Sequence, residues 1–222
     1  MNGTLELENV VTGFGIRKKV YKITKRSFDV LMAMLGVIVM IPIILVIKTS
    51  YLLSGDKKSI FYKQIRIGKD GKKFELFKFR SMVWNADEIL KELLKEKKYK
   101  EEWDRYQKIN NDPRITKVGN LLRKTSLDEL PQMINILKGD MSLIGPRPLI
   151  EGELDEHHGN HEIYEKVRPG LTSWWAANGR SNIEYEDRLA LEYYYVNHMS
   201  FLLDIKCIIR TVKVVFKKSG AK

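Results

Sequence analysis

Residues 30–47 read VLMAMLGVIVMIPIILVI, a run of eighteen residues without a charged side chain. This length meets the lower limit for a helix that enters a lipid bilayer. A cleavable signal peptide is excluded, because the run begins far from Met1 and no small-residue cleavage site follows it. A buried core helix is the remaining alternative, but a core helix of this length usually carries a polar stripe. We therefore expect a membrane segment.

Basic residues lie on both sides of this apolar run. They are Arg17, Lys18, Lys19, Lys22, Lys25 and Arg26 before it, and Lys48, Lys57, Lys58, Lys63 and Arg66 after it. Positive residues mark the cytoplasmic side of a membrane segment, so the two flanks favour both ends on the same side. Pro42 lacks a backbone N–H and clashes with the preceding turn, so it predicts a break. We therefore expect a re-entrant membrane helix with its break at Pro42, against the alternative of a spanning helix.

The composition favours a partner with negative charge. The 222 residues include 39 Lys and Arg against 28 Asp and Glu, which gives a formal net charge of +11. This surplus suits nucleic acid, anionic lipid headgroups or a phosphorylated substrate, and a merely solvated surface is the alternative. The single cysteine, Cys207, excludes an internal disulfide and a cysteine-rich zinc site. The sequence contains neither a P-loop nor a dinucleotide-binding glycine motif.

These patterns divide the chain into three parts. Residues 1–24 form a basic N-terminal tail, 25–50 the re-entrant membrane helix, and 51–222 a cytoplasmic domain. Within that domain, alternating runs at 59–67 and 73–79 flank an Asp-Gly turn and predict a β-hairpin. Helices are expected at 85–108, 116–124, 186–198 and 200–216, the last suited to a membrane surface. The predicted fold class is α+β and mostly helical, a monotopic membrane-associated domain with a short hairpin and surface amphipathic helices.

Two short segments carry the candidate chemistry. Residues 124–132 read KTSLDELPQ and place Asp128 and Glu129 side by side, with Arg123 just before them. Residues 145–148 read GPRP, and the flanking prolines hold Arg147 in extended backbone. Carboxylates beside arginines suit work on a phosphate ester. One carboxylate attacks or takes a proton, the other holds a metal ion, and the arginines bind the negative charge.

The helix that follows the acidic pair has two competing start registers. Ser126 with Glu129 makes a capping box, but this register places Pro131 deep enough to lose a helix hydrogen bond. Asp128 as the N-cap places Pro131 in the first turn, where proline is tolerated. Either register gives one carboxylate a structural role, which is the alternative to catalysis. Gly139 is expected to end this helix.

In their order along the chain, these motifs resemble the bacterial sugar transferases, monotopic phosphoglycosyl transferases that act on polyprenol phosphate. The resemblance covers roughly residues 25–216, and the short segment before the apolar run suggests a small, minimal-length member. The matching elements are Lys25-Arg26-x-x-Asp29, Phe61-Tyr62-Lys63-Gln64-x-Arg66-x-Gly68, Phe77-Lys78-Phe79-Arg80-Ser81-Met82, Arg123-x-x-Ser126-Leu127-Asp128-Glu129-Leu130-Pro131-Gln132, Asn135-x-x-x-Gly139-Asp140-Met141-Ser142-x-x-Gly145-Pro146-Arg147-Pro148, Arg168-Pro169-Gly170-Leu171-Thr172 and Asn178-Gly179-Arg180.

The resemblance implies a reaction and its partners. Such enzymes move a sugar 1-phosphate from a UDP-sugar to undecaprenyl phosphate, release UMP, and work with Mg2+ through a covalent phosphosugar-enzyme intermediate. The product begins the assembly of a capsule, exopolysaccharide, O-antigen or glycoprotein glycan. The implied location is the cytoplasmic face of the bacterial inner membrane, in contact with anionic lipid. A homodimer is also considered.

The resemblance also implies roles for individual residues. Asp128 is expected to be the nucleophile, kept ionised by nearby arginines and a metal ion, and Glu129 is expected to help hold Mg2+. The expected phosphate- and substrate-binding residues are Arg123, Arg147, Lys78, Arg80 and Arg180. At the membrane break the family often has Ser-Pro, whereas this chain has Ile41-Pro42. The break is therefore expected to depend on the proline alone.

Two other classes of function were weighed against the transferase. A non-catalytic, membrane-tethered basic scaffold fits the charge, but it has no need of Asp128, Glu129 and Arg147 together. A nucleic-acid binder also fits the charge, but it fits neither the apolar run nor the absence of a recognised binding motif in the sequence. The sequence favours the transferase and predicts no nucleic-acid partner.

Overall fold

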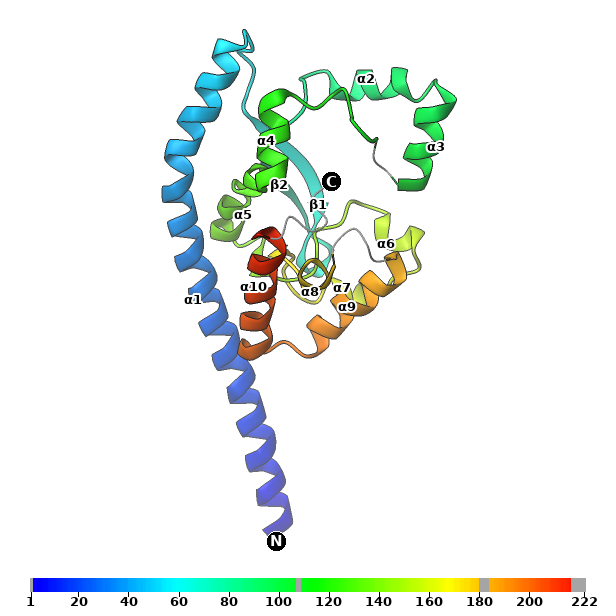
Figure 1. The fold of residues 1–222 in the computed structure, drawn as a ribbon. Coiled ribbons are helices and arrows are strands. Elements are labelled where there is room, and N and C mark those ends of the chain that lie inside the picture. The colour runs from blue at the N-terminus through cyan, green and yellow to red at the C-terminus, as the bar shows by residue number, and fades with distance from the viewer. Residues whose placement is uncertain (1, 107–108, 180–183, 217–222) are drawn as a thin grey trace.

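The structure is a computed structural model. It describes residues 2–106, 109–179 and 184–216, except for the side chains of residues 2–17, 105, 106, 215 and 216. Figure 1 shows one very long helix, α1 (Asn2–Leu53), that runs along one side of the rest of the chain. The expected substrate residue Arg180 lies outside the described residues.

Helix α1 is continuous through Pro42. The expected helix break at Pro42 is therefore wrong for this structure, and the expected N-terminal tail is helical from Asn2 onward. Lateral packing explains the difference. Proline removes one hydrogen bond from a helix, but Met40 before it and Ile47 and Tyr51 after it are buried in one shared core cluster. Because one core cluster holds both halves, the helix stays continuous through the proline, although its axis bends in the upper part of Figure 1.

A buried carboxylate fixes how α1 sits against the domain. Asp29 is 3% exposed and stands just before the apolar run. Its carboxylate accepts hydrogen bonds from the Ser142 hydroxyl at 2.8 Å and from the Leu143 N–H at 3.0 Å. A buried charge without such partners costs several kcal/mol, so this contact sets both the position and the rotation of α1.

Two basic residues of the same motif attach α1 to other elements. Lys25 forms a salt bridge of 3.1 Å with Asp204 of α10 (Phe201–Phe216). Arg26 donates to the Ile136 carbonyl at 2.8 Å, in α5 (Gln132–Lys138), where terminal carbonyls need donors. The motif Lys25-Arg26-x-x-Asp29 therefore serves here to dock the helix onto the domain.

The remaining surface of α1 is apolar and exposed. Its most apolar window, within Lys18–Leu53, is only 17% buried, and this is the helix among the described residues that is long and apolar enough to cross a membrane. A core helix is mostly buried, so the core-helix alternative does not fit. The exposed apolar side chains of α1 include Leu31, Leu35, Ile38, Ile41, Leu45 and Leu52.

The predicted hairpin is confirmed. Strands β1 (Phe61–Ile67) and β2 (Lys73–Phe79) pair antiparallel from Phe61↔Phe79 to Ile67↔Lys73. A short 3-10 turn, η1 (Lys69–Gly71), joins them, and Asp70 takes the left-handed conformation that the turn requires (φ 58°). The expected helix at 116–124 is also confirmed as α4 (Lys117–Thr125), which Thr116 caps through its side chain.

The expected single helix over 85–108 is wrong. The structure has α2 (Ala86–Leu93) and α3 (Lys97–Tyr106), separated by a turn in which Lys95 and Glu96 donate to carbonyls three residues back. The helical pattern was correct, but no residue of α2 is buried. A charged segment of this length that lacks a fully buried face has little to keep it in one helix.

The second half of the domain is built around a small parallel pair of strands. Strand β3 (Ser142–Ile144) pairs with β4 (Gly170–Thr172), and a Cβ on Gly170 would collide with the backbone of Gly145. The loop after β3 therefore needs glycine on both sides of this contact. The other elements are α6 (Glu153–Glu156), α7 (His161–Tyr164), α8 (Trp174–Asn178) and α9 (Tyr185–Asn197), so the helices expected at 186–198 and 200–216 are confirmed.

Replacing Asp29 tests the docking of α1. In Asp29→Ala the Ser142 hydroxyl and the Leu143 N–H lose their buried acceptor, so we expect the free energy of unfolding to fall by about 2–3 kcal/mol. Thermal unfolding of the detergent-solubilised protein, followed by circular dichroism, measures the change. The matched control is Asp87→Ala, because Asp87 is exposed at the start of α2. Equal unfolding temperatures for the two variants would contradict the docking role.

Candidate active site

The acidic pair lies in a separate turn between two helices. Helix α4 ends at Thr125, Ser126 takes the left-handed conformation (φ 56°), and a 3-10 turn, η2 (Leu127–Glu129), follows. Leu127 and Leu130 pack against the core cluster that also holds α1. Because these two apolar side chains anchor the turn, Asp128 and Glu129 are held between them in a half-buried position.

Neither expected cap register is observed. Helix α5 begins at Gln132, Pro131 occupies its N-cap position, and no side-chain cap is formed at either helix start. The 3-10 turn η2 lies between α4 and α5, so α5 begins only after Pro131. At this position the missing N–H of the proline costs no helix hydrogen bond, which was the difficulty with the capping-box register. The structural alternative for the pair, a role as helix cap, is therefore excluded here. The expected helix end at Gly139 is confirmed, with φ 91°.

Two cations surround the pair. The Lys78 ammonium, near the end of β2, lies 2.9 Å from Oε1 of Glu129. Arg123 in α4 is exposed, and its Nε donates to the Ser81 hydroxyl at 2.9 Å. Both cations lie close enough to Asp128 to lower the pKa of its carboxyl. The structure thus brings together Asp128, Glu129, Lys78 and Arg123, as the sequence predicted.

The surroundings of Asp128 act on its carboxyl in both directions. Burial raises the pKa of the Asp128 carboxyl above its ordinary value, the negative charge of Glu129 raises it further, and Lys78 and Arg123 oppose this. Carboxylates side by side resist losing both protons. Further positive charge at the pair would favour the ionised form of Asp128.

The acidic pair could supply two carboxylate ligands to a magnesium ion. No group of three His, Cys, Asp or Glu side chains that could enclose a metal occurs in the described part of the chain. Mg2+ does not need such a group, because it commonly binds one or two carboxylates together with waters and substrate phosphate oxygens. Asp128 and Glu129 can supply those carboxylate oxygens. The pKa of Asp128 is raised, and a bound cation would lower it.

Arg80 follows Lys78 by two residues and is buried. It is 4% exposed, its Nη1 lies 2.8 Å from Asp56, and its Nε donates to the Ser59 carbonyl at 2.7 Å. The Tyr51 ring stacks 4.4 Å from the guanidinium. These contacts tie the segment after α1 to the end of the hairpin. A phosphate-binding role for Arg80 stays a prediction, and the contacts seen here are structural.

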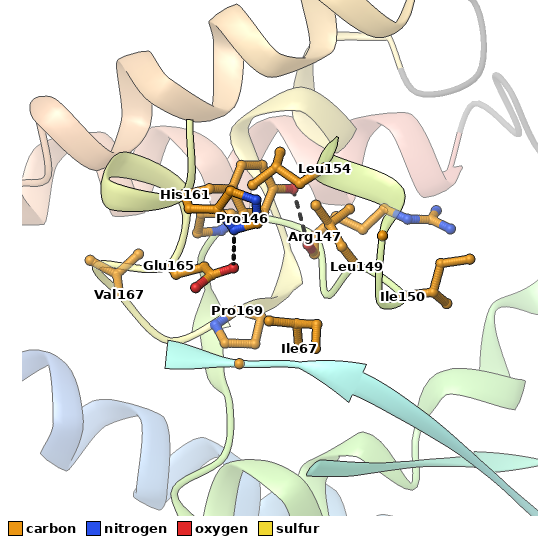
Figure 2. Close-up of a pocket in the computed structure, with 13 residues that line it drawn as sticks. Ile67, Pro146, Arg147, Leu149, Ile150, Leu154, His161, Glu165, Val167 and Pro169 are labelled. Carbon is orange, nitrogen blue, oxygen red and sulfur yellow. Dashed lines mark hydrogen bonds and ion pairs between the residues drawn. The ribbon is translucent and has the colours of Figure 1, made fainter. Parts of the chain in front are cut away.

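Arg147 is exposed, and its backbone is clamped from both sides. Its N–H donates to Oε1 of Glu192 at 3.2 Å, and the Tyr164 hydroxyl donates to its carbonyl at 3.0 Å. The guanidinium carbon lies 5.9 Å from the centre of the Trp175 ring. Figure 2 shows the guanidinium pointing away from the side chain of Glu165. The expected phosphate ligand thus has a rigid backbone and a side chain that reaches solvent.

A small cavity lies behind the Arg147 loop (Figure 2). Its volume is about 30 Å³, enough for a water molecule but not for a sugar nucleotide. His161 borders it, and hydrogen bonds to Asp155 and Glu165 raise the pKa of this histidine. The cavity is therefore too small to be a substrate pocket.

The sequence did not assign the surroundings of Arg147. Arg66 and Arg188 approach Glu153 at 3.9 and 3.3 Å. Burial lowers the pKa of Arg66, and the nearby charges of Arg147 and Arg188 lower it further. We call Arg66, Arg147 and Arg188, with Trp175, the arginine cluster. Arg66 belongs to one of the motifs that resemble the family, so the sequence contained a signal that it could be a functional residue. Arg188 lies in a predicted helix whose sequence pattern contained no such signal.

The hairpin connects the acidic pair to the arginine cluster. In the β1–β2 register Tyr62 faces Lys78 and Arg66 faces Phe74, so Lys78 and Arg66 project from the same face of the hairpin. Four residues of strand separate their levels, which corresponds to about 13 Å. Phe74 and Leu76 project from the same face between them and are buried in a core cluster, so packed side chains separate the two groups of charged residues.

An acidic pair among cations, at the end of a hairpin beside a long apolar helix, defines a membrane-associated α+β protein with a site suited to phosphate esters. Comparison with known proteins supplies the family. The profile described as Bacterial sugar transferase matches residues 20–218, nearly the whole chain. The chain belongs to the bacterial sugar transferase family.

Several relatives carry more specific names. The chain is 43% identical over 200 residues to the exopolysaccharide production protein ExoY of Sinorhizobium fredii, which covers 90% of this chain and 88% of the relative. It is 41% identical to the undecaprenyl-phosphate galactose phosphotransferase of Salmonella typhimurium, over 93% of this chain and 43% of the relative. It is 37% identical to the UDP-glucose:undecaprenyl-phosphate glucose-1-phosphate transferase of Escherichia coli, over 91% and 42%. The chain thus spans less than half the length of the latter two.

The protonation of Asp128 gives a pH prediction. An ionised nucleophile is required, so activity should rise with pH through a limb that lies above the ordinary aspartate pKa of about 3.9. Replacing Lys78 with methionine removes a charge that lowers this pKa, so the limb should move to higher pH. The pH dependence of kcat/KM, measured for the native protein and Lys78→Met, checks the shift. An exposed control is Lys91→Met, and a limb that is identical in all three would contradict the assignment.

Proposed function

We propose that this protein transfers a sugar 1-phosphate from a UDP-sugar to undecaprenyl phosphate and releases UMP. The observation that carries the proposal is the turn that holds Asp128 and Glu129 beside Lys78 and Arg123. The printed names of the relatives support it, because they describe sugar phosphotransferases that use undecaprenyl phosphate. Capsule or exopolysaccharide assembly is the corresponding process, in keeping with the name of the ExoY relative.

In the first step an oxygen of the Asp128 carboxylate attacks the β-phosphorus of the UDP-sugar. The bond between that phosphorus and the bridging oxygen breaks, and UMP leaves with the electron pair. A phosphosugar remains bonded to Asp128. Arg123 and Lys78 lie where they can take up the charge that develops on the phosphate oxygens.

In the second step a phosphate oxygen of undecaprenyl phosphate attacks the same phosphorus. The bond to Asp128 breaks, its carboxylate is restored, and the polyprenyl diphosphate sugar is released. Both substrates are anionic, and the two-step route means that they never meet in one transition state. A single nucleophile set between cations suits this sequence of events.

Mg2+ is proposed as the metal ion of the reaction. When bound, it supplies positive charge at the phosphate oxygens. Glu129 and Asp128 would hold it through carboxylate oxygens, and Lys78 would remain the counter-charge of Glu129. The raised pKa of Asp128 supports this choice, because a bound cation would favour its ionised form.

The membrane arrangement follows from where the domain contacts α1. The contacts run from Tyr21, which donates to Asp204, to Tyr51, which donates to the Arg80 carbonyl. Thirty residues of helix span about 45 Å, more than the roughly 30 Å of a bilayer core. A crossing helix would carry these polar contacts into lipid. We therefore propose a monotopic protein on the cytoplasmic face of the bacterial inner membrane, with the exposed apolar side of α1 in one leaflet.

Two further partners of the sequence analysis stay predictions. Anionic lipid is supported by the basic flanks of α1, including Lys19 and Lys48. A homodimer has no specific observation behind it. The alternative function, a membrane-tethered scaffold, gives no reason for an extra turn that keeps Asp128 and Glu129 out of capping.

The reaction is tested by UMP release from a panel of UDP-sugars, with undecaprenyl phosphate and Mg2+. We expect release with at least one sugar, and a loss of roughly a thousandfold or more in Asp128→Asn. Asp87→Asn, at an exposed position, is the control for expression and folding. Release that persists in Asp128→Asn would remove Asp128 as the nucleophile. No release with any sugar would favour the scaffold.

The membrane arrangement is tested by cysteine labelling in a chain whose native Cys207 is replaced by serine. Single cysteines at Lys19 and Lys57 lie on opposite sides of the apolar run, and both positions are exposed. A membrane-impermeant maleimide, applied to inverted membrane vesicles, should label both. Labelling of one position from each side of the membrane would show that the helix spans it.

A further inference from the structure

The arginine cluster contains buried polar atoms without partners. Within the described residues, Nε of Arg66, Nε of Arg188, Nε1 of Trp175 and Oε2 of Glu192 are buried and have no hydrogen-bond partner. Arg188 is 7% exposed and Glu192 is fully buried. Buried polar groups are nearly always satisfied in proteins, so four unsatisfied atoms around one point call for an explanation.

The unpartnered atoms are of both kinds. Three are N–H donors, from two arginines and a tryptophan, and one is a carboxyl oxygen that accepts. A simple anion can satisfy the donors but has nothing to donate to Glu192. A neutral heterocycle that carries carbonyl groups on both sides of an N–H can satisfy both kinds. The uracil base has this arrangement on its edge.

The protonation of Glu192 agrees with a site for a neutral group. Burial raises the pKa of this carboxyl to about 7, although Ser173, the Arg147 N–H and the charge of Arg188 all lower it. The arginines are moreover partly neutralised already, because both Arg66 and Arg188 approach Glu153. The buried part of the cluster therefore carries less charge than three arginines suggest.

Aromatic rings line the same region. The Arg188 guanidinium stacks 4.9 Å from the Trp175 ring and 4.6 Å from the Tyr185 ring. His157 stacks on Tyr185 with ring centres 3.5 Å apart. Flat cations and aromatic rings in parallel layers form a setting into which a nucleic-acid base fits by stacking.

The position of the cluster favours a water-soluble ligand over a lipid. Figure 1 shows α1 along one side of the domain, with α6 and α9, which carry Glu153 and Arg188, on the opposite side. Arg66 pairs with Phe74, which is four residues from Lys78 on β2, so the two cations are separated by about 13 Å along the strand direction. A nucleoside diphosphate can bridge this separation when its β-phosphate is at Asp128.

We propose that the arginine cluster is the pocket for the nucleoside end of the donor, and that it reads the uracil base through Arg188, Trp175 and Glu192. This inference rests on the proposed function and adds the site that selects uridine. Arg147, the exposed member, lies over Trp175 and moves off the ring when the base enters. Its guanidinium then faces the phosphate next to the nucleoside.

The test measures binding of two probes, UMP and inorganic phosphate, to the full chain in lipid nanodiscs by isothermal titration calorimetry. We expect Arg188→Gln and Trp175→Phe each to weaken UMP binding about tenfold or more, because each removes a hydrogen bond to the base. Phosphate binding should stay unchanged in both. Trp175→Phe keeps an aromatic ring and tests the N–H alone, and Lys91→Gln, at an exposed position, is the matched control.

Equal weakening of UMP and phosphate would make the cluster a general anion site and overturn the proposal. Unchanged UMP affinity in both variants, or no UMP binding by the native chain, would also overturn it. Because Arg188→Gln removes a buried ion pair and can unfold the chain, hydrogen exchange of the native protein provides a second measurement. UMP should protect backbone amides of residues 184–192 and 147–150. Protection confined to residues 123–129 would place the nucleotide elsewhere.

UMP binding and UMP release, both measured on the native chain, separate this inference from the proposed reaction. UMP binding at the cluster without turnover of any UDP-sugar would support the pocket and remove the reaction. Turnover of a UDP-sugar, together with a UMP affinity that is unchanged in Arg188→Gln and Trp175→Phe, would support the reaction and overturn the proposed pocket.

Discussion

The structure depends on a single buried carboxylate, that of Asp29. It accepts hydrogen bonds from Ser142 and Leu143, and both are needed because a carboxyl group that is 3% exposed has little contact with water that could replace them. They fix α1 against β3, and β3 leads directly into the Gly145-Pro146-Arg147 loop. The core cluster that includes Met40 of α1 also holds Leu127, which anchors the turn of the acidic pair. The apolar helix and the acidic pair are thus linked through one core cluster, so α1 also positions the turn that carries Asp128.

Charged residues gather at both ends of the hairpin, and the two groups have different surroundings. At one end Lys78 and Arg123 accompany two carboxylates, whose mutual repulsion and burial raise the pKa of Asp128. At the other end the arginine cluster surrounds Trp175, with Glu153 partly neutralising the arginines and Glu192 buried. The first arrangement leaves the carboxyl of Asp128 with a raised pKa, and the second leaves buried donors of Arg66, Arg188 and Trp175 without partners among the described residues.

The local elements were largely predictable, and the failures share one cause. The hairpin follows from alternation around an Asp-Gly turn, and the end of α5 from Gly139, because turns and caps are determined by neighbouring residues. The break at Pro42 and the single helix over 85–108 were wrong. Proline argues for a break only where nothing supports the helix from the side, and a charged segment stays in one helix only where something packs on it. Both conditions are tertiary.

The sequence by itself determined the membrane-facing helix, the adjacent carboxylates and the arginine between prolines, because each depends on residues that are neighbours in the chain. The residues and the family resemblance together grouped Asp128 and Glu129 with Arg123, Arg147, Lys78, Arg80 and Arg180. Of these cations, the structure places Lys78 and Arg123 beside the acidic pair. Only the tertiary structure decided that Arg80 is buried in an ion pair with Asp56, and that Glu192 clamps the backbone of Arg147 from 45 residues away. Burial and long-range hydrogen bonds depend on how distant segments pack, and no local pattern records that packing.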